Sequence, residues 1–303
     1  MSYRIAGGKP LAEEIRRIAV EEIDAASALL ANASNDRQRA VHQARKRLKR
    51  LRGLVKLVRV ADPAFHAAEN ARYRDLARSL APLRDADTLV ETADRFLTKS
   101  RKKEAAAHFH TVRGHLVARR ARIIAAHHDT DFRAILAAFA KAREPMAGFT
   151  LPASEEKAAH LLLEGGDDML RRARKALKRA RRRGEAEDFH DLRKAIKYHR
   201  MHLSLFEELR PESSARRRSA DLLGERLGEL NDIDVLRAAL AEEEGGIAGP
   251  EPLRAVLKRL ADREKALRKV CLQEAGELLD RRTKFAPRPA RAVSAPAPEP
   301  VRD

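Results

Sequence analysis

Apolar residues recur at spacings of three and four along almost the whole chain, from Lys9 to Lys284. The residues between them are mostly Ala, Arg, Lys and Glu, which favour helix. No segment shows the alternation of apolar and polar positions that is typical of hairpin strands. The pattern therefore predicts an all-α protein whose helices end at clusters of small, polar, Pro or Gly residues. These clusters lie at Asn32–Asp36, Ala61–Pro63, Glu144–Pro152, Arg183–Gly184, Arg210–Pro211 and Gly245–Pro252.

Two motifs occur twice and in the same order. The octet His-x-x-Arg-Lys-x-x-Lys spans His42–Lys49 and again His190–Lys197, at an offset of 148 residues. Leu-Arg-Asp-x-Asp at 83–87 is matched by Leu-Asn-Asp-x-Asp at 230–234, at an offset of 147. Such repetition predicts two similar helical bundles in tandem. The predicted units are residues 1–148 and 149–284, followed by a disordered Pro/Ala-rich tail at 285–303.

The octet places its four defined residues on one face of a helix, because each residue turns the helix by about 100°. Arg52 and Arg200 extend the same face in each copy. The apolar residues of both segments fall on the opposite arc, which we expect to be buried. Each cationic face is a line of roughly 15 Å and suits an extended chain of phosphates better than one phosphate. We call the two lines the first and second stripe: His42, Arg45, Lys46, Lys49 and Arg52, and His190, Arg193, Lys194, Lys197 and Arg200.

The composition agrees with an anionic partner. The formal charge is +18, and residues 41–60 contain eight Lys or Arg and no acid, so the stripe is not balanced within its own helix. Aromatic residues make up 4% of the chain and Trp is absent, which argues against binding single strands by base stacking. A lone cysteine, Cys271, excludes an intramolecular disulfide. With no signal-like or membrane-spanning apolar segment, we expect a soluble intracellular protein.

Three further features have alternative interpretations. The acids of the second motif, Asp85, Asp87, Asp232 and Asp234, are candidate metal ligands of a phosphohydrolase, but capping a helix or orienting the stripe cations is preferred. The run Arg171–Arg183 contains nine cations and no acid, and is a second phosphate-binding strip, a DNA-facing arm or a solvated face. His199 and His202 have helical spacing, which is only weak evidence for a metal site.

The paired octet helices, each followed by its Asp-containing motif, resemble the CHAD domain, an all-helical, histidine-containing family. The resemblance covers roughly Lys9 to Arg282. It implies two pseudo-symmetric four-helix bundles with the basic helices facing a central cleft. It also implies that the ten stripe residues bind inorganic polyphosphate, and that the protein is cytoplasmic and associated with polyphosphate granules. The two half-sites differ, because Tyr198 matches Arg50 and Asn231 matches Arg84.

The resemblance gives no reason to expect catalysis, a metal or a cofactor, because no segment resembles the triphosphate-tunnel domain that supplies chemistry in some relatives. We therefore expect a binding protein and not an enzyme. Two alternatives remain at this point: a nucleic-acid-binding or nucleoid-associated protein, and a metal-dependent polyphosphatase. Oligomeric state, chain-length preference and the purpose of the tail are not set by the sequence.

Overall fold

The computed structural model describes residues 3–33, 36–98, 103–126, 132–242, 250–280 and 283–285, except for the side chains of 82–85, 104–105 and 250. Within these residues the chain forms α-helices, one short 3₁₀ helix (η1, Pro211–Ser213) and no strand, so the predicted all-α class is confirmed. None of the described helices is both long and apolar enough to cross a membrane. The helices are α1 Leu11–Ala31, α2 Arg37–Leu57, α3 Pro63–Ser79, α4 Ala81–Thr98, α5 Lys103–Ala126, α6 Arg133–Ala147, α7 Glu155–Arg183, α8 Ala186–Leu205, α9 Ser214–Glu242 and α10 Pro250–Leu278.

Several helix ends lie where the sequence predicts them and have a local cause. Asp36 caps α2 by accepting from the backbone N of Arg39 at 2.9 Å, and Asp62 caps α3 in the same way. Gly184 ends α7 with φ of +71°, a left-handed conformation that favours glycine. The predicted break at 245–252 falls largely on 243–249, outside the described residues.

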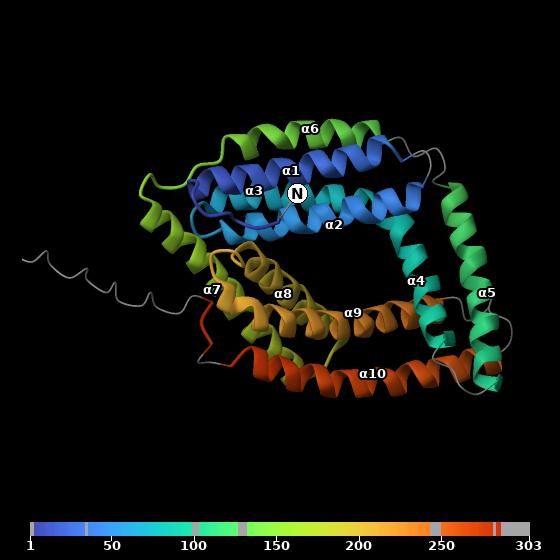
Figure 1. The fold of residues 1–303 in the computed structure, drawn as a ribbon. Helices are drawn as coiled ribbons and strands as arrows, with labels where there is room; N and C mark the ends of the chain where they lie inside the picture. The colour runs from blue at the N-terminus through green and yellow to red at the C-terminus, as the bar shows by residue number, and fades with distance from the viewer. Residues whose placement is uncertain are drawn as a thin grey trace, which may run out of the picture.

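The break between α3 and α4 was not predicted, and it redirects the chain. Helix α3 ends at Ser79 and α4 begins at Ala81, with Pro82 in its first turn. Proline lacks the backbone N–H and clashes with the preceding turn, so a continuous helix is not stable there. At the offset of 147, the second half has Glu229, and α9 runs through this position without a break. As a result, α3 stays beside α2 while α4 turns away from it (Figure 1).

The helices form two closed sets joined by a hairpin. Helices α1, α2, α3 and α6 contact one another in a ring, and so do α7, α8, α9 and α10. Helices α4 and α5 pair with each other, and they pack on α9 and α10 respectively (Figure 1). The predicted boundary after residue 148 lies between α6 and α7. That boundary assigns the α4–α5 hairpin to the first unit. The hairpin nevertheless packs on helices of the second unit, and so it connects the two units.

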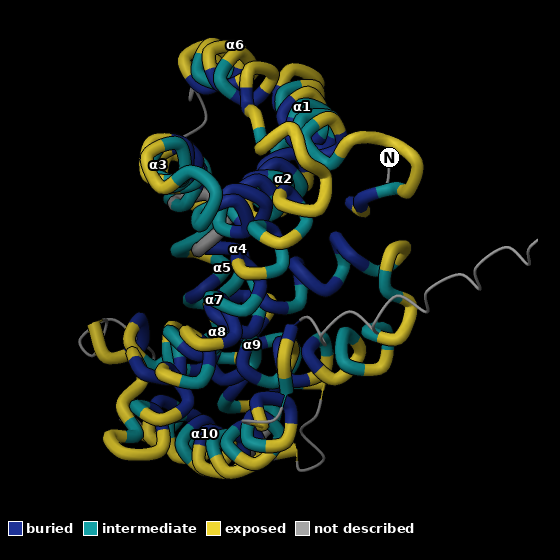
Figure 2. Tube along the Cα trace, turned by 90° about the vertical axis from the view of Figure 1, so that its left-hand side faces the viewer, coloured by how far each residue is buried: buried dark blue, intermediate teal, exposed yellow. Residues whose placement is uncertain are grey.

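A single buried apolar cluster runs through both rings. The apolar arcs predicted for the two stripe helices are buried, as shown by Leu48 and Leu51 of α2 and by Leu192 and Ile196 of α8. In Figure 2 the exposed segments of α6 and α10 lie at opposite ends of the molecule, with the buried parts of α2 and α8 between them. The stripe helices are therefore central elements, held by the core of both rings.

Phe285, the first residue of the predicted tail, is also the last described residue of the chain. Phe285 is buried, and its ring lies edge-on to those of His199 and His202, with centroid distances of 5.9 and 6.3 Å. Gly166 of α7 makes room for it, since a Cβ there would lie 2.2 Å from the Phe285 ring. An aromatic ring of this size gains more from burial than the chain loses by being ordered at one residue. Residues 286–303 are outside the described residues.

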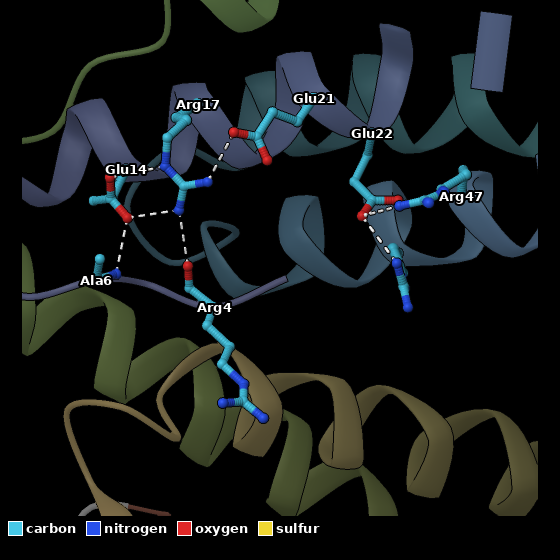
Figure 3. Close-up of polar contacts among 8 residues, drawn as sticks. Arg4, Ala6, Glu14, Arg17, Glu21, Glu22 and Arg47 are labelled. Atoms are coloured by element: carbon cyan, nitrogen blue, oxygen red, sulfur yellow. Dashed lines mark hydrogen bonds and ion pairs between the residues drawn. The ribbon is translucent and has the colours of Figure 1, made fainter. Parts of the chain in front are cut away.

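The start of the chain also joins the two rings. Glu14 accepts from the backbone N of Ala6 at 2.8 Å, and Arg17 donates both to Glu14 and to the carbonyl of Arg4 (Figure 3). The buried Ile5 then donates its backbone N–H to the carbonyl of Leu205, at the end of α8, at 2.8 Å. This segment ties α1 to α8 next to the crossing of the stripe helices.

Candidate functional site

Helices α2 and α8 cross at equivalent residues. The carbonyl of Gly53 accepts from Nε2 of the buried His202 at 2.9 Å, and a Cβ on Gly53 would lie 2.9 Å from Sδ of Met201. Gly53 and Met201 are separated by 148 residues, the same offset as the two octets. Contact between a residue and its own counterpart is the mark of a local two-fold axis. The duplication therefore brings the two stripes together at their C-terminal ends.

Lys49 and Lys197 are the counterparts one turn before this crossing. Burial, followed by the nearby cations Arg193 and Lys49, lowers the pKa of Lys197 to about 7. The negative charge of Asp232 raises the pKa of Lys197, but by less than burial and the cations lower it. The two stripes thus repel each other at their closest approach, and a bound anion would relieve both the repulsion and the cost of burial.

Three of the stripe arginines are held by neighbouring helices. Arg45 donates to the carbonyl of Ala77 at 2.6 Å, and Arg52 donates to Oδ1 of Asn70 at 3.3 Å, both on α3. In the second stripe, Arg200 pairs with Asp221 on α9 at 2.9 Å. The partner helices correspond, since α9 matches α3 followed by α4. Lys46, Lys49 and Lys194 are exposed, whereas the histidines and arginines of the stripes are half-buried.

The second Asp-containing motif lies against the second stripe. Nδ1 of His190 hydrogen-bonds to Oδ1 of Asn231, which leaves Nε2 for a ligand. Asp232 binds Arg95 of α4 at 2.8 Å and acts electrostatically on Arg193 and Lys197. This geometry agrees with an orienting role for Asp232. Asn231 replaces the arginine that the first half has at the equivalent position, Arg84, and it is the hydrogen-bond partner of the stripe histidine His190.

The other acids of the motif point elsewhere. Asp234 lies near Glu264 of α10, and burial followed by this like charge raises its pKa to about 6. Asp87, at the equivalent place, is buried and lies 3.9 Å from Arg120 of α5. The side chain of Asp85 is outside the described residues. Because Asp232 and Asp234 face different neighbours, they do not form a paired carboxylate site. Among the described residues, no group of three His, Cys, Asp or Glu is placed to hold a metal ion.

Acids on other helices pair with three cations in or just after α2 that lie outside the stripe. The buried Glu22 of α1 binds Arg47 at 2.9 Å and Arg50 at 3.1 Å. Figure 3 shows the contact between Glu22 and Arg47. Arg59, just after α2, lies 3.6 Å from Asp168 of α7. The lack of acids within residues 41–60 is thus partly corrected by the tertiary structure. The sequence does not reveal this partition, because the acids come from distant segments.

The basic run of α7 is divided between two faces. Arg174 donates to the carbonyls of Leu279, Asp280 and Thr283, and so satisfies the C-terminal end of α10. Arg179 and Arg183 lie at 3.7 and 3.3 Å from Asp188 at the start of α8. Part of the run is therefore structural, and it is not the uniform strip or arm that the sequence suggests.

The other face of the run lines a cavity of about 450 Å³ between α2, α7 and α8. Arg52 and Lys194 reach it from the two stripes, and Lys175 reaches it from α7. Lys56 also lines it, and burial, followed by Arg52 and Arg59, lowers its pKa to about 8. Lys56 is not among the residues predicted for the stripe, although its position four residues after Arg52 puts it on the same helical face.

The two histidines with helical spacing belong to the core. His199 and His202 are both buried, and burial is the main reason why the pKa of His202 falls to about 4 and that of His199 falls well below its usual range. Both pack on Phe285. Both histidines are therefore packing side chains on the inner face of α8.

The comparisons with known proteins agree with this architecture. A crystal structure of the CHAD domain from the plant Ricinus communis is similar, with a TM-score of 0.64 and 20% identity, over 92% of this chain and 96% of that one. PptA from Streptomyces chartreusis is also similar, with a TM-score of 0.64 and 15% identity, over 89% of this chain and 100% of that one. No curated protein sequence matches the chain. The CHAD domain family model matches residues 17–241, about three quarters of the sequence and both stripes, so the chain belongs to the CHAD domain family.

Proposed function

We propose that the protein binds inorganic polyphosphate non-covalently along the two stripes and does not hydrolyse it. The observation that carries the proposal is the meeting of Lys49 and Lys197 at the crossing of α2 and α8, where a half-buried ammonium group lies among other cations. A linear chain of phosphates matches two lines of cations whose C-terminal ends meet at the crossing. Membership of the CHAD domain family supports the same ligand class.

The acids next to the stripes support binding rather than catalysis. Asp232 is engaged with Arg95 at 2.8 Å, and Asp234 faces α10. In this proposal Asp232 and Asn231 hold stripe side chains in place, and neither takes part in a reaction. The resemblance to the family extends the proposal to cytoplasmic polyphosphate granules, which co-localisation in cells with and without a polyphosphate source would test.

The direct test is a titration of long-chain polyphosphate into the wild-type protein and into a Lys49→Met and Lys197→Met double variant. Each lost phosphate contact removes about 1.5–3 kcal/mol, so we expect the double variant to bind at least about 100-fold more weakly. Lys141→Met, on the exposed side of α6, is the matched control and should bind as the wild type does. Equal affinity in all three proteins would contradict the proposal. Release of phosphate in the presence of Mg²⁺ or Mn²⁺ would contradict its non-enzymatic part.

A further inference from the structure

The cavity between α2, α7 and α8, which we call cavity A, has a counterpart on the other side of the crossing. Cavity B is lined by Arg50, Arg200 and Ser204, together with the start of the chain and α9. At the offset of 148, Arg52 of cavity A corresponds to Arg200 of cavity B, and Lys56 corresponds to Ser204. Tyr198 of cavity A corresponds to Arg50. The duplication thus produced two related cavities, one at each side of the pseudo-two-fold axis.

The cations of cavity B are neutralised. Arg50 binds Glu22 at 3.1 Å, and Arg200 binds Asp221 at 2.9 Å. The two other arginines that line it, Arg4 and Arg217, bind Glu207 at 2.9 and 2.8 Å. Four cations are therefore matched by three carboxylates, and each cation has a carboxylate partner.

Cavity A has kept an excess of positive charge. Arg52, Lys56 and Lys194 come from α2 and α8, and α7 adds four more cations, which makes seven. Only two carboxylates, Asp168 and Asp191, line the same cavity. They form ion pairs with four of these seven cations, Arg171, Arg172, Arg179 and Lys194. Among the described residues, no carboxylate forms an ion pair with the remaining three, Arg52, Lys56 and Lys175.

Lys56 is the residue that distinguishes the two cavities most clearly. Its Nζ lies 5.0 Å from the centroid of the Tyr198 ring, a cation–π distance that fixes its position. Among the described residues, no carboxylate forms an ion pair with this ammonium group. Burial and the neighbouring arginines Arg52 and Arg59 lower its pKa to about 8. A half-buried cation in a cavity with surplus positive charge is a prepared anion site.

We propose that cavity A binds the terminal residues of a linear polyphosphate chain, and that the stripes bind its internal residues. A terminal phosphate has a second ionisable oxygen with a pKa of about 6 and carries close to two charges at neutral pH, whereas an internal phosphate carries one. A compact cavity with dense positive charge favours the more charged end group. Its position also fits, since Lys56 lies one turn beyond Arg52, where the first stripe ends. This inference rests on the proposed function for the identity of the ligand.

The test compares linear tripolyphosphate, which has two ends, with cyclic trimetaphosphate, which has the same number of phosphorus atoms and no end. Calorimetric titration should give at least about tenfold tighter binding of the linear compound. In ³¹P spectra, the signal of the terminal phosphates should broaden before that of the central one. Equal affinity for the two compounds would overturn the inference.

Variants locate the site within the same experiment. A Lys56→Met and Lys175→Met double variant should lose at least about tenfold in affinity for tripolyphosphate. Lys56→Arg keeps the charge and should retain binding, which separates loss of charge from misfolding. Lys178→Met is the matched control, because Lys178 lies one turn after Lys175 but lines a different cavity, against α10. Unchanged binding in the double variant, or an equal loss in the Lys178→Met control, would overturn the inference.

The long-chain ligand separates this inference from the proposed function. The cavity A variants should bind long-chain polyphosphate within about threefold of the wild type, because most contacts are made by the stripes. The Lys49→Met and Lys197→Met variant should show the opposite pattern, with long-chain binding lost and tripolyphosphate binding kept. If the wild type does not bind long chains, the proposed function fails, and the comparison of linear with cyclic compound still decides on cavity A.

Discussion

Lys197 shows how a single residue links stability to binding. Its ammonium group is half-buried at the crossing of the stripe helices, next to Arg193 and Lys49, and its pKa is about 7 instead of the usual 10.5. In the unfolded chain the same group is solvated and stays protonated up to about pH 10.5. The folded protein without ligand therefore carries a free-energy cost at this position, which the proposed binding of a polyanion would offset.

Lys197→Met should stabilise the ligand-free protein at pH 7, by about 1 kcal/mol or more. Between pH 7 and 10.5 the unfolded wild type holds a proton that the folded protein has lost, so the stability of the wild type relative to the variant rises with pH. The advantage of the variant should therefore shrink as the pH is raised from 7 to 10. Urea unfolding of both proteins at several pH values measures this difference. A difference that does not vary with pH would contradict the pKa assigned to Lys197.

The affinity for polyphosphate should change with pH in the opposite direction to the stability. An anion favours the protonated ammonium group, so the affinity for long-chain polyphosphate should fall as the pH rises through the pKa of Lys197, from about 6.5 to 9. Lys197→Arg keeps its charge throughout this range and should flatten the profile. Titrations at constant ionic strength provide the test. The same slope in both proteins would show that Lys197 does not contact the ligand.

At the scale of the elements, two glycines allow the stripe helices to approach their neighbours closely. Gly53 lies at the crossing of α2 and α8. Gly165 of α7 lies against the end of α2, where a Cβ would be 1.9 Å from the carbonyl oxygen of Leu57. The close approach of α7 to α2 sets the depth of cavity A, because both helices line it.

Gly165→Ala should destabilise the protein by roughly 2–4 kcal/mol, although alanine favours a helix over glycine by about 1 kcal/mol. The added Cβ would collide with the backbone carbonyl of Leu57, which cannot move unless α2 moves with it. Gly114→Ala on α5 is the control, since a Cβ at this position would have nothing within 4 Å of it, and it should be neutral or stabilising. Urea denaturation of both variants decides the matter. A stable Gly165→Ala variant would mean that α2 and α7 pack less closely than the structure shows.

Much of this arrangement could be predicted from local pattern, and the rest required tertiary contacts. The helical angles of residues 41–60 separate the buried arc from the stripe, because burial follows the period of the helix. The break between α3 and α4 has a local signal in Pro82, but a proline in the first turn of a helix does not by itself show how the chain is redirected. The pairing of Arg47 and Arg50 with Glu22 was not predictable, because nothing local brings α1 beside α2 in that register. For the same reason, the division of the α7 run into structural and cavity-lining cations was not predictable.

At the scale of the whole molecule, the duplication has produced a pseudo-symmetric pair of stripes within an asymmetric protein. The stripes meet at equivalent residues, and Arg95 joins the α4–α5 hairpin to Asp232 of the second ring. The two cavities beside the crossing have diverged, because every cation that lines cavity B has a carboxylate partner, whereas cavity A keeps cations in excess. The symmetric part of the molecule is thus suited to a repeating ligand, and the asymmetric part can give that ligand a direction.

In the proposed function, the stripes select polyphosphate and do not attract every polyanion. The most direct measurement is a titration of long-chain polyphosphate in the presence of duplex DNA at matched phosphate concentration and fixed salt. Both polymers release counterions when they bind, so a purely electrostatic surface would treat them alike. We predict that polyphosphate binding stays within about threefold of its value without DNA, because the stripes are spaced for a single flexible chain. Competition by DNA on equal terms would contradict the account.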